Sequence, residues 1–459
     1  MREELAFISV PAPRRAAAAA LSALRPIGNS SLVAWLPPDG AHHIGLDSAA
    51  ALAGPVSSAA LRLEADTLLA SIRIRTHGAL PPISPRLLGG FAFDPCAPIG
   101  PVWESFGEGR LLLPRWTYGQ DREHAWVSLA ANTPLTEGER DAVLTEMAVI
   151  LEVLECLPEE GAEARGAELA RAHEEAFADK VTSGSRSSVL GGDPAGETIE
   201  VWKGRVEAIL HAIETEKVVK VVAARSVELP LEESLEPPAI LGELKRRFRQ
   251  CTGFYLETNG CAFLGATPER LVRVVGSHVE TEALAGSAPP GRGEDLLESR
   301  KDRLEHRLVL DEIVTRLGPL CDEIREGRTR ALELRNVGHL QTPIRARRRR
   351  AVRALDLVTA LHPTPAVGGV PRDEALRWIA ESERVSRGWY AGPFGWLDAS
   401  GNAEFVVALR SALLHGGVAR LYAGAGIVSG SNPDAEWVET EAKMRAVGEA
   451  LAAGTSVRA

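Results

Sequence analysis

The chain has 459 residues and a net charge of −10, from 52 basic and 62 acidic side chains, with 45% hydrophobic and 25% charged residues. This length suggests two or three domains or one large body, and the ordinary balance of apolar and charged residues excludes a disordered protein or a disulfide scaffold. The negative charge argues against a general nucleic-acid binder, because the phosphate backbone is met by excess positive charge.

The first third of the chain is expected to be β-rich. Short apolar runs bounded by turn residues predict strands within 30–40, 71–78, 86–95, 110–119 and 125–131. An Ala-rich run at 16–24 predicts an amphipathic helix rather than a signal peptide. No stretch approaches the roughly 18 apolar residues that cross a bilayer. We therefore expect no membrane segment and a cytoplasmic protein, which five cysteines without a CxxC pair also favour.

The strongest loop signal divides the chain. Residues 158–180 are rich in Ala, Glu and Arg and predict a solvated helix, and the segment after them is rich in Gly, Ser, Asp and Pro. We therefore predict a β-rich N-terminal portion (1–158), a helix and linker (159–197), and a C-terminal portion (198–459) that carries the candidate catalytic groups.

The C-terminal portion shows strands and helices in runs. Helices are predicted at 199–216, 293–325 and 434–451, and the basic run 347–350 is expected to be the solvated start of another. A strand is predicted at 217–229, a strand–turn–strand unit at 261–276, and a strand pair at 404–414 and 419–428. Because these elements do not alternate strictly, an α+β fold is favoured over a doubly wound α/β fold.

Lysine usage singles out one residue. Only 7 of the 52 basic residues are lysines, and Lys220 shares one face of a Val-rich strand with Val222 and Ala224. Burial disfavours the charged ammonium, so a lysine here could serve as a general base for water. The alternative, equally compatible with the local pattern, is an exposed lysine that snorkels to solvent.

Acidic residues provide the other candidates. Glu269 follows an apolar strand in a tight turn, where a side chain is readily presented to a cleft. By itself it is more simply explained as a surface carboxylate beside Arg270. Two further clusters have helical spacing: Asp302, Glu305 and His306, and Glu436, Glu439 and Lys443. Carboxylates from two helices suit Mg²⁺, whereas salt bridging on solvated faces is the simpler alternative.

Two Gly-rich segments, 283–293 and 421–436, could bring backbone N–H groups to an anion, although neither matches the dinucleotide GxGxxG pattern. Arg410 could add a bidentate carboxylate clamp. His339 is more simply explained as a structural histidine.

Ten segments in this order resemble the chorismate-utilising enzymes, the family of isochorismate, salicylate, anthranilate and aminodeoxychorismate synthases. The resemblance is strong over 198–459 and is closest to isochorismate synthases of the menaquinone pathway. It implies that family's α+β fold, with stacked β-sheets and outer helices. The segments are KVVAAR, FLGATPERL, TEALAGS, KDRLEH, GHLQTP, LHPTPAVGG, WYAGPFGW, FVVALRSALL, LYAGAGIV and EWVETEAK.

The resemblance also implies roles. Lys220 matches the base that activates water, and Glu269 matches the acid that protonates the departing ring hydroxyl. Glu305 and Glu439 match Mg²⁺ ligands, with Glu436 a nearby carboxylate. The positions that match those holding the substrate or lining its pocket are Gly286, Ser287, His339, Thr364, Ala366, Val367, Arg410, Tyr422, Gly424 and Lys443.

The expected reaction is conversion of chorismate to isochorismate, for menaquinone biosynthesis or, as the alternative, for a siderophore. Ammonia-using members of the family lack a lysine at the position of Lys220 and work with a glutamine-hydrolysing partner, so no such partner is expected here. Salicylate synthases also use water and a lysine, but Leu284 and Ser287 depart from their usual IAGT segment. An inactive binding homologue is disfavoured because all four matched base, acid and metal positions are filled. The family also implies a monomer.

Overall fold

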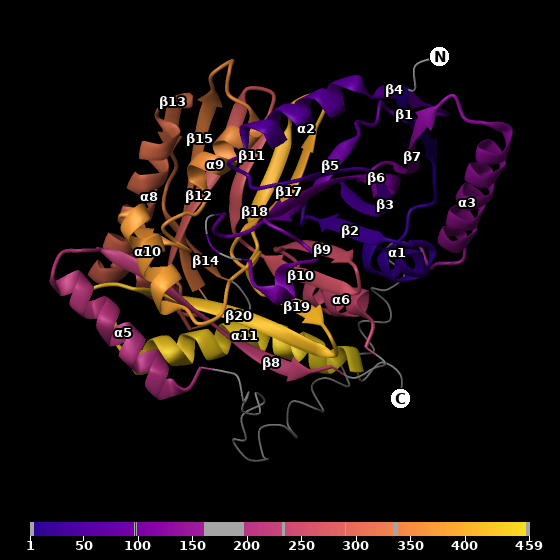
Figure 1. The fold of residues 1–459 in the computed structure, drawn as a ribbon. Coiled ribbons are helices and arrows are strands. Elements are labelled where there is room, and N and C mark those ends of the chain that lie inside the picture. The colour runs from indigo at the N-terminus through magenta and orange to yellow at the C-terminus, as the bar shows by residue number, and fades with distance from the viewer. Residues whose placement is uncertain are drawn as a thin grey trace.

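The computed structural model describes residues 4–95, 97, 99–159, 197–231, 235–289, 291–333 and 338–455. Its strands form one continuous twenty-stranded sheet that divides at β6 (Gly109–Gln120) into two arms. Helices cover the outer faces of these arms, so the expected α+β fold is confirmed (Figure 1). Most of the predicted helix and linker, residues 160–196, lies outside the described residues.

The first arm starts from β3, on one long side of β6, and continues through antiparallel pairs. Strands β7, β1 and β4 extend the sheet from the other side of β6. In spatial order the strands are β4 (Arg73–Thr76), β1 (Glu4–Pro11), β7 (Ala125–Thr133), β6, β3 (His42–Ala53), β2 (Ser31–Leu36), β9 (Thr252–Thr258), β10 (Cys261–Thr267), β19 (Ser411–His415), β20 (Val418–Ile427), β8 (Lys220–Pro230) and β16 (Gly369–Val370).

The second arm leaves β6 through β5 and is likewise antiparallel, with β13 and β14 both paired to β15. Its strands are β5 (Arg86–Phe91), β17 (Pro393–Asp398), β18 (Ala403–Val407), β11 (Arg270–Val275), β12 (His278–Ala288), β15 (Gly338–Arg348), β13 (Cys321–Glu326) and β14 (Arg330–Glu333). Early and late parts of the chain meet in both arms, because β2 pairs with β9 and β5 with β17. The division of the chain near residue 158 remains a prediction.

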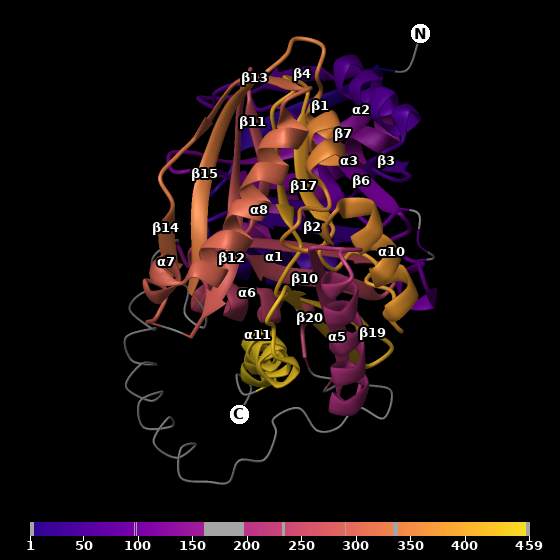
Figure 2. The same cartoon turned by 90° about the vertical axis from the view of Figure 1, so that its left-hand side faces the viewer.

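Helices pack on the outside of this sheet. Figures 1 and 2 show α11 lying along β20, and α8 lying over β12. None of the helices in the described ranges combines the length and the apolar character needed to span a bilayer. The helices are α1 (Ala17–Leu24), α2 (Ala59–Ser71), α3 (Glu137–Glu155), α5 (Ile199–Glu214), α6 (Pro237–Arg247), α7 (Asp295–Glu298), α8 (Arg300–Leu317), α9 (Ala354–Leu361), α10 (Arg372–Ser382) and α11 (Pro433–Thr455), with short 3₁₀ turns at Arg25–Ile27 and Pro101–Trp103.

The strands of the first arm are apolar on both faces because both faces are covered. In β9, Phe254 and Leu256 face the core between the arms, whereas Tyr255 faces the core beneath α1, α6 and α11. In β10 the same alternation places Phe263 in the first core and Leu264 in the second. Period-two alternation thus explains why these strands appear as continuous apolar runs in the sequence.

Three sequence-based expectations were wrong in detail. The helix predicted at 293–325 ends at Leu317, because Pro319 cannot continue it, and residues from Cys321 form β13 on the edge of β15. The run at 347–350 does not start a helix: Arg347 and Arg348 end β15, and α9 begins at Ala354.

Residues 404–414, predicted as one strand, form two strands in different arms. Strand β18 belongs to the second arm and β19 to the first, and the chain crosses between them at Arg410, whose φ is +48°. This crossing places Arg410 where the two arms meet.

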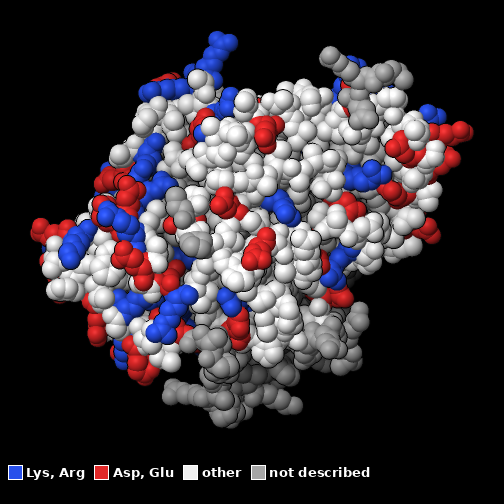
Figure 3. All heavy atoms as spheres, in the orientation of Figure 1, with Lys and Arg blue, Asp and Glu red and all other residues white. Residues whose placement is uncertain are grey.

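Charged side chains cover the outside of α8 and its neighbours. In the face that Figure 3 shows, acidic and basic side chains are interspersed over this part of the molecule. Ion pairs such as Arg307 with Glu326, at 3.0 Å, and Arg316 with Glu312, at 2.7 Å, belong to this surface. These solvated pairs account for much of the charge in α8, while the inward side of the helix contributes to a cavity.

Candidate active site

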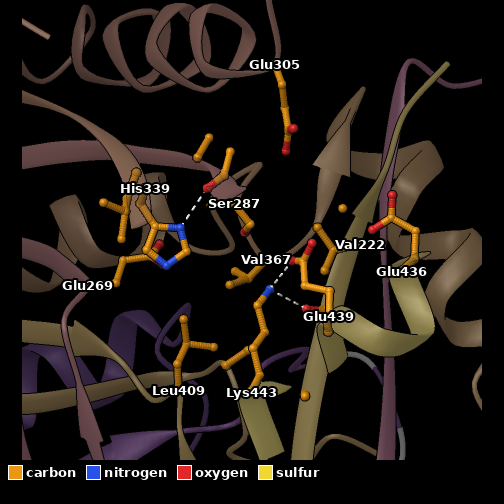
Figure 4. Close-up of a pocket in the computed structure, with 18 of the residues that line it drawn as sticks. Val222, Glu269, Ser287, Glu305, His339, Val367, Leu409, Glu436, Glu439 and Lys443 are labelled. Carbon is orange, nitrogen blue, oxygen red and sulfur yellow. Dashed lines mark hydrogen bonds and ion pairs between the residues drawn. The ribbon is translucent and has the colours of Figure 1, made fainter. Parts of the chain in front are cut away.

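A cavity lies between the first arm, β12 of the second arm, and the helices α8 and α11 (Figure 4). Every predicted site residue except Thr364 lines it, and Thr364 contacts one that does. The lining residues are Lys220, Val222, Pro268, Glu269, Leu284, Ala285, Gly286, Ser287, Lys301, Asp302, Glu305, His339, Ala366, Val367, Arg387, Tyr390, Ala391, Leu409, Arg410, Tyr422, Ala423, Gly424, Gly426, Glu436, Glu439 and Lys443.

Lys220 begins β8 and points into the cavity. Its side chain is only 2% exposed, so the alternative of a lysine that snorkels to solvent was wrong. The Lys220 Nζ donates a hydrogen bond of 2.8 Å to Glu305 Oε1 on α8. A Cβ at Gly426, on the neighbouring strand β20, would lie 3.0 Å from Lys220 Cε, so a glycine there leaves room for the amine.

Glu269 lies in the turn between β10 and β11 and is also buried. Arg270 pairs with Glu404 at 3.1 Å instead, so Glu269 is not a surface carboxylate held by its neighbour. Thr364 Oγ1 donates a weak hydrogen bond of 3.4 Å to Glu269 Oε1. Burial and then the nearby charge of Glu282 raise the pKa of Glu269 to about 7, which keeps a large share of the carboxyl protonated near neutrality.

Three glutamates face the cavity from two helices. Glu305 projects from α8, and Glu436 and Glu439 project from α11 (Figure 4). The simple salt-bridge alternative holds for part of this set, because Glu439 pairs with Lys443 at 2.6 Å one helical turn away. Glu305 is different, since its partner is Lys220 across the cavity wall. Lys443 also donates a hydrogen bond of 2.8 Å to the carbonyl of Gly424.

The two glutamates on α11 have opposite proton affinities. Burial and then the charge of Glu439 raise the pKa of Glu436 to about 7. Burial also opposes ionisation of Glu439, but the Lys443 ammonium and a hydrogen bond from Ser287 outweigh it and lower the pKa of Glu439. Among the described residues, no three acidic, histidine or cysteine side chains are grouped closely enough to hold a metal ion as they stand.

His306 does not join Glu305 in the cavity, although helical spacing placed it beside that residue. Its Nε2 lies 2.6 Å from Thr342 Oγ1 under α8. His339, in contrast, does line the cavity. Burial and then Arg410 lower the pKa of His339 to about 4, so the ring is neutral near pH 7. Its Nδ1 lies 2.7 Å from the carbonyl of Gly286, which can only accept, so Nδ1 carries the proton and Nε2 is an acceptor.

Sequence reasoning assigned no site role to Lys301, Arg387, Tyr390 or Leu409, all of which line the cavity. The rarity of lysine could have pointed to Lys301, because three of the chain's 7 lysines, Lys220, Lys301 and Lys443, line the cavity. Tyr390 lies in the segment WYAGPFGW and stacks on Tyr422 with ring centroids 5.0 Å apart. No local pattern marked Arg387.

Comparisons with known proteins agree with one another. The family model described as "Chorismate binding enzyme" matches residues 2–452. A curated relative, the salicylate biosynthesis isochorismate synthase of Pseudomonas aeruginosa, is 38% identical over 387 residues, which cover 81% of this chain and 75% of the relative.

Solved structures show the same fold. The menaquinone-specific isochorismate synthase MenF from Escherichia coli superposes with a TM-score of 0.74 at 26% identity, covering 98% of this chain and 96% of that one. Anthranilate synthase component I from Streptococcus pneumoniae, at 20% identity and a TM-score of 0.67 over 90% of this chain and 92% of its own, shares the fold. The chain therefore belongs to the family of chorismate binding enzymes.

Proposed function

We propose that this protein is an isochorismate synthase, which converts chorismate to isochorismate by adding water and removing the ring hydroxyl. The observation that carries the proposal is the placement of a buried amine, Lys220, and a buried carboxyl with a pKa of about 7, Glu269, on the wall of one cavity. A base and an acid on different elements are what this reaction requires, because the proton removed and the proton given are at different ring positions.

The cavity offers cationic side chains to a doubly negative substrate. The cationic residues Arg410, Lys443 and Lys301 line the cavity together with Lys220. Gly286 and Gly424 also line it, and the absence of a side chain at these positions exposes their backbone to the cavity. We propose that Arg410 and Lys443 hold substrate carboxylates, since guanidinium and ammonium groups form strong charge-assisted hydrogen bonds with them. The neutral His339 offers an acceptor at Nε2 for a substrate hydroxyl.

In the proposed mechanism the Lys220 amine acts as the base and takes a proton from water. The oxygen attacks the ring carbon next to the carboxylate-bearing carbon, and the ring double bonds shift. The C–O bond of the departing hydroxyl breaks as Glu269 donates its proton, so that water leaves. Each positioned proton transfer contributes about 10²–10⁴-fold to the rate.

The donor set fits a magnesium ion. Glu305, Glu439 and Glu436 offer only carboxylate oxygens, which Mg²⁺ prefers. Burial and then the charge of Glu439 raise the pKa of Glu436, and a bound cation would offset both effects. We propose that these three residues hold Mg²⁺, with Glu436 acting directly or through water. When bound, the ion neutralises the ring carboxylate and stabilises the charge that develops on it.

The neighbours of the base and acid favour isochorismate as the final product. Lys220 supports water rather than ammonia as nucleophile, so we propose that the enzyme acts without a glutamine-hydrolysing partner. Leu284 and Ser287 line the cavity and differ from the segment usual in salicylate synthases. We also propose that the protein is monomeric and cytoplasmic.

The product is proposed to serve menaquinone biosynthesis. The E. coli protein, which superposes over 98% of this chain, is described as menaquinone-specific. The name of the P. aeruginosa relative instead supports a supply of isochorismate for salicylate, which is the second candidate. Deleting the gene separates them: loss of menaquinone, restored by added isochorismate, supports the first, and loss of a salicylate-derived product supports the second.

The activity itself is tested by incubating the purified protein with chorismate and Mg²⁺ and separating the products. Isochorismate alone is the expected result. Salicylate with an equal amount of pyruvate identifies a salicylate synthase, and no consumption of chorismate identifies a binding homologue.

A further inference from the structure

Arg387 is a buried arginine whose guanidinium joins two parts of the cavity wall. It follows α10, and its side chain is only 4% exposed. Its Nη2 donates a hydrogen bond of 2.7 Å to the carbonyl of Val222, and its Nη1 donates one of 2.7 Å to the carbonyl of Val367. The guanidinium also lies 4.2 Å from the ring centre of Phe93, which packs against its face.

The two carbonyls belong to the segments that carry the base and support the acid. Val222 lies two residues after Lys220 in β8. Val367 closes a turn with Thr364, because the amides of Val367 and Gly368 both donate to the Thr364 carbonyl, at 3.1 and 2.9 Å. The Thr364 hydroxyl in turn reaches Glu269. One side chain therefore connects the strand of the base with the turn beside the acid.

Glu383 completes this connection. Arg387 Nε donates to Glu383 Oε2 at 2.8 Å, and the amide of Ala224 donates to Glu383 Oε1 at 2.9 Å. The Glu383 side chain is 7% exposed. It accepts a hydrogen bond from a backbone amide of β8, while Arg387 donates one to a backbone carbonyl of the same strand. The ion pair thus contacts the backbone of β8 at two points, the carbonyl of Val222 and the amide of Ala224. The amide of Val222 adds a direct bond of 2.8 Å to the carbonyl of Gly368.

We propose that Arg387, held by Glu383, is a positioning residue that sets the spacing between the base strand and the acid-supporting turn. This inference rests on the proposed function of Lys220 and Glu269. The planar fork of the guanidinium reaches Val222 and Val367 together, whereas a lysine ammonium at the end of a flexible chain does not reproduce that geometry. Misplacement of reacting groups by about 1 Å costs on the order of 10²-fold in rate.

The test compares Arg387→Lys with Arg377→Lys. Arg377 on α10 also pairs with a glutamate, Glu374 at 2.9 Å, but that pair is exposed. For Arg387→Lys we expect kcat per folded molecule to fall about 10²-fold with KM for chorismate within about threefold, because the proposed carboxylate-holding residues lie on other elements. Glu383→Gln should give a smaller loss in the same parameter, since it keeps an acceptor. Arg377→Lys should change neither.

Amide hydrogen exchange gives a second readout that does not depend on activity. In Arg387→Lys, exchange should rise locally in 220–224 and 364–370 and remain unchanged in α3 and β7. A rise throughout the molecule would mean general destabilisation and would overturn the proposal.

The two proposals fail in different ways. If the wild-type protein makes no isochorismate from chorismate, the proposed function is wrong, and the positioning role falls with it. If the wild type is active and Arg387→Lys retains kcat within about threefold, only the positioning role is wrong.

Discussion

The Nζ of Lys220 lies 2.8 Å from Oε1 of Glu305, so the proposed base and a proposed metal ligand form one ion pair. The side chain of Lys220 is 2% exposed and that of Glu305 is 13% exposed, so Glu305 is the member of the pair that is more open to the cavity. This relationship links the two parts of the proposed mechanism, because any cation that binds Glu305 competes directly with the Lys220 ammonium. The same cavity contains the second pair, Lys443 with Glu439.

Replacing Lys220 by alanine should nearly abolish turnover while the protein remains folded. The variant lacks the amine that accepts the proton from water, and loss of one proton transfer is worth about 10²–10⁴-fold. The measurement is the rate of isochorismate formation, together with a thermal unfolding curve. Lys217→Ala, which removes an exposed lysine three residues earlier, is the matched control. A folded Lys220→Ala protein with most of its rate would eliminate Lys220 as the base.

Local patterns singled out the two candidate residues, and the order of motifs then suggested their roles. Lys220 stands in a Val-rich strand, Glu269 follows an apolar strand at a turn, and the order of motifs suggested which enzymes use such residues. Burial decided what the local pattern left open. The sequence allows Lys220 to face either side of its strand, and the structure places its amine beside Gly426 of the neighbouring strand β20 and against Glu305 of α8.

What the sequence did not predict depends on contacts between distant segments. The crossing at Arg410 separates two strands that read as one apolar run, because only their partners, β11 and β10, show that they belong to different arms. Arg387 acts through the carbonyls of Val222 and Val367, which no side-chain pattern reveals. The end of α8 was within reach of the sequence, since Gly318 and Pro319 follow its last residue.

The activity should fall as the pH rises above about 7. Glu269 donates a proton in the proposed mechanism, and burial raises its pKa to about 7, so the protonated form is lost above that value. A plot of log kcat against pH should therefore decline by about one decade per pH unit on the alkaline side. Glu269→Gln should lower kcat by about 10²–10⁴-fold and remove this limb from any residual activity. An unchanged alkaline limb in the variant would assign that ionisation to another group.

The same carboxyl should make the stability of the metal-free protein depend on pH. Its pKa in the folded protein, about 7, lies above the ordinary value of 4.5. The contribution of Glu269 to the free energy of unfolding is therefore fully present below pH 4.5 and is lost as the pH rises through 7. The shift corresponds to about 3 kcal/mol of unfolding free energy. Urea unfolding at pH 5 and pH 8, in the presence of a chelator, measures it.

Glu269→Gln should reduce the difference in unfolding free energy between the two pH values by a large part of that amount. Glu207→Gln, at an exposed position of α5, should leave the difference unchanged. Equal pH dependence in the wild type and in Glu269→Gln would show that Glu269 is ionised in the folded protein throughout this range.

Removing the negative charge of Glu439 should weaken the dependence on magnesium. Glu439→Gln keeps the size of the side chain but replaces a charged donor with a neutral one, so the Mg²⁺ concentration for half-maximal activity should rise at least about tenfold. Titration of activity with Mg²⁺ measures this, with Glu449→Gln near the far end of α11 as the control. Glu449 pairs with Arg247 at 2.9 Å and does not line the cavity. A magnesium titration equal to the wild type would make the Glu439–Lys443 pair purely structural.

Adding one methyl group at Gly426 should disturb the base without removing it. A Cβ there would lie 3.0 Å from Lys220 Cε, 3.1 Å from Glu305 Oε1 and 3.3 Å from Lys220 Nζ, so the ion pair must shift by a few tenths of an ångström. We expect Gly426→Ala to lower kcat about tenfold, since small displacements of a reacting group are costly. The control is Gly448→Ala in α11, where the nearest atom, Leu421 Cδ1, is 3.8 Å from the added Cβ. The backbone of Gly426 is not in the left-handed region, so alanine is compatible with it. A loss of activity in a stably folded Gly426→Ala protein would therefore report on the position of the Lys220 amine. Full activity would mean that the Lys220–Glu305 pair can shift without affecting the proton transfer.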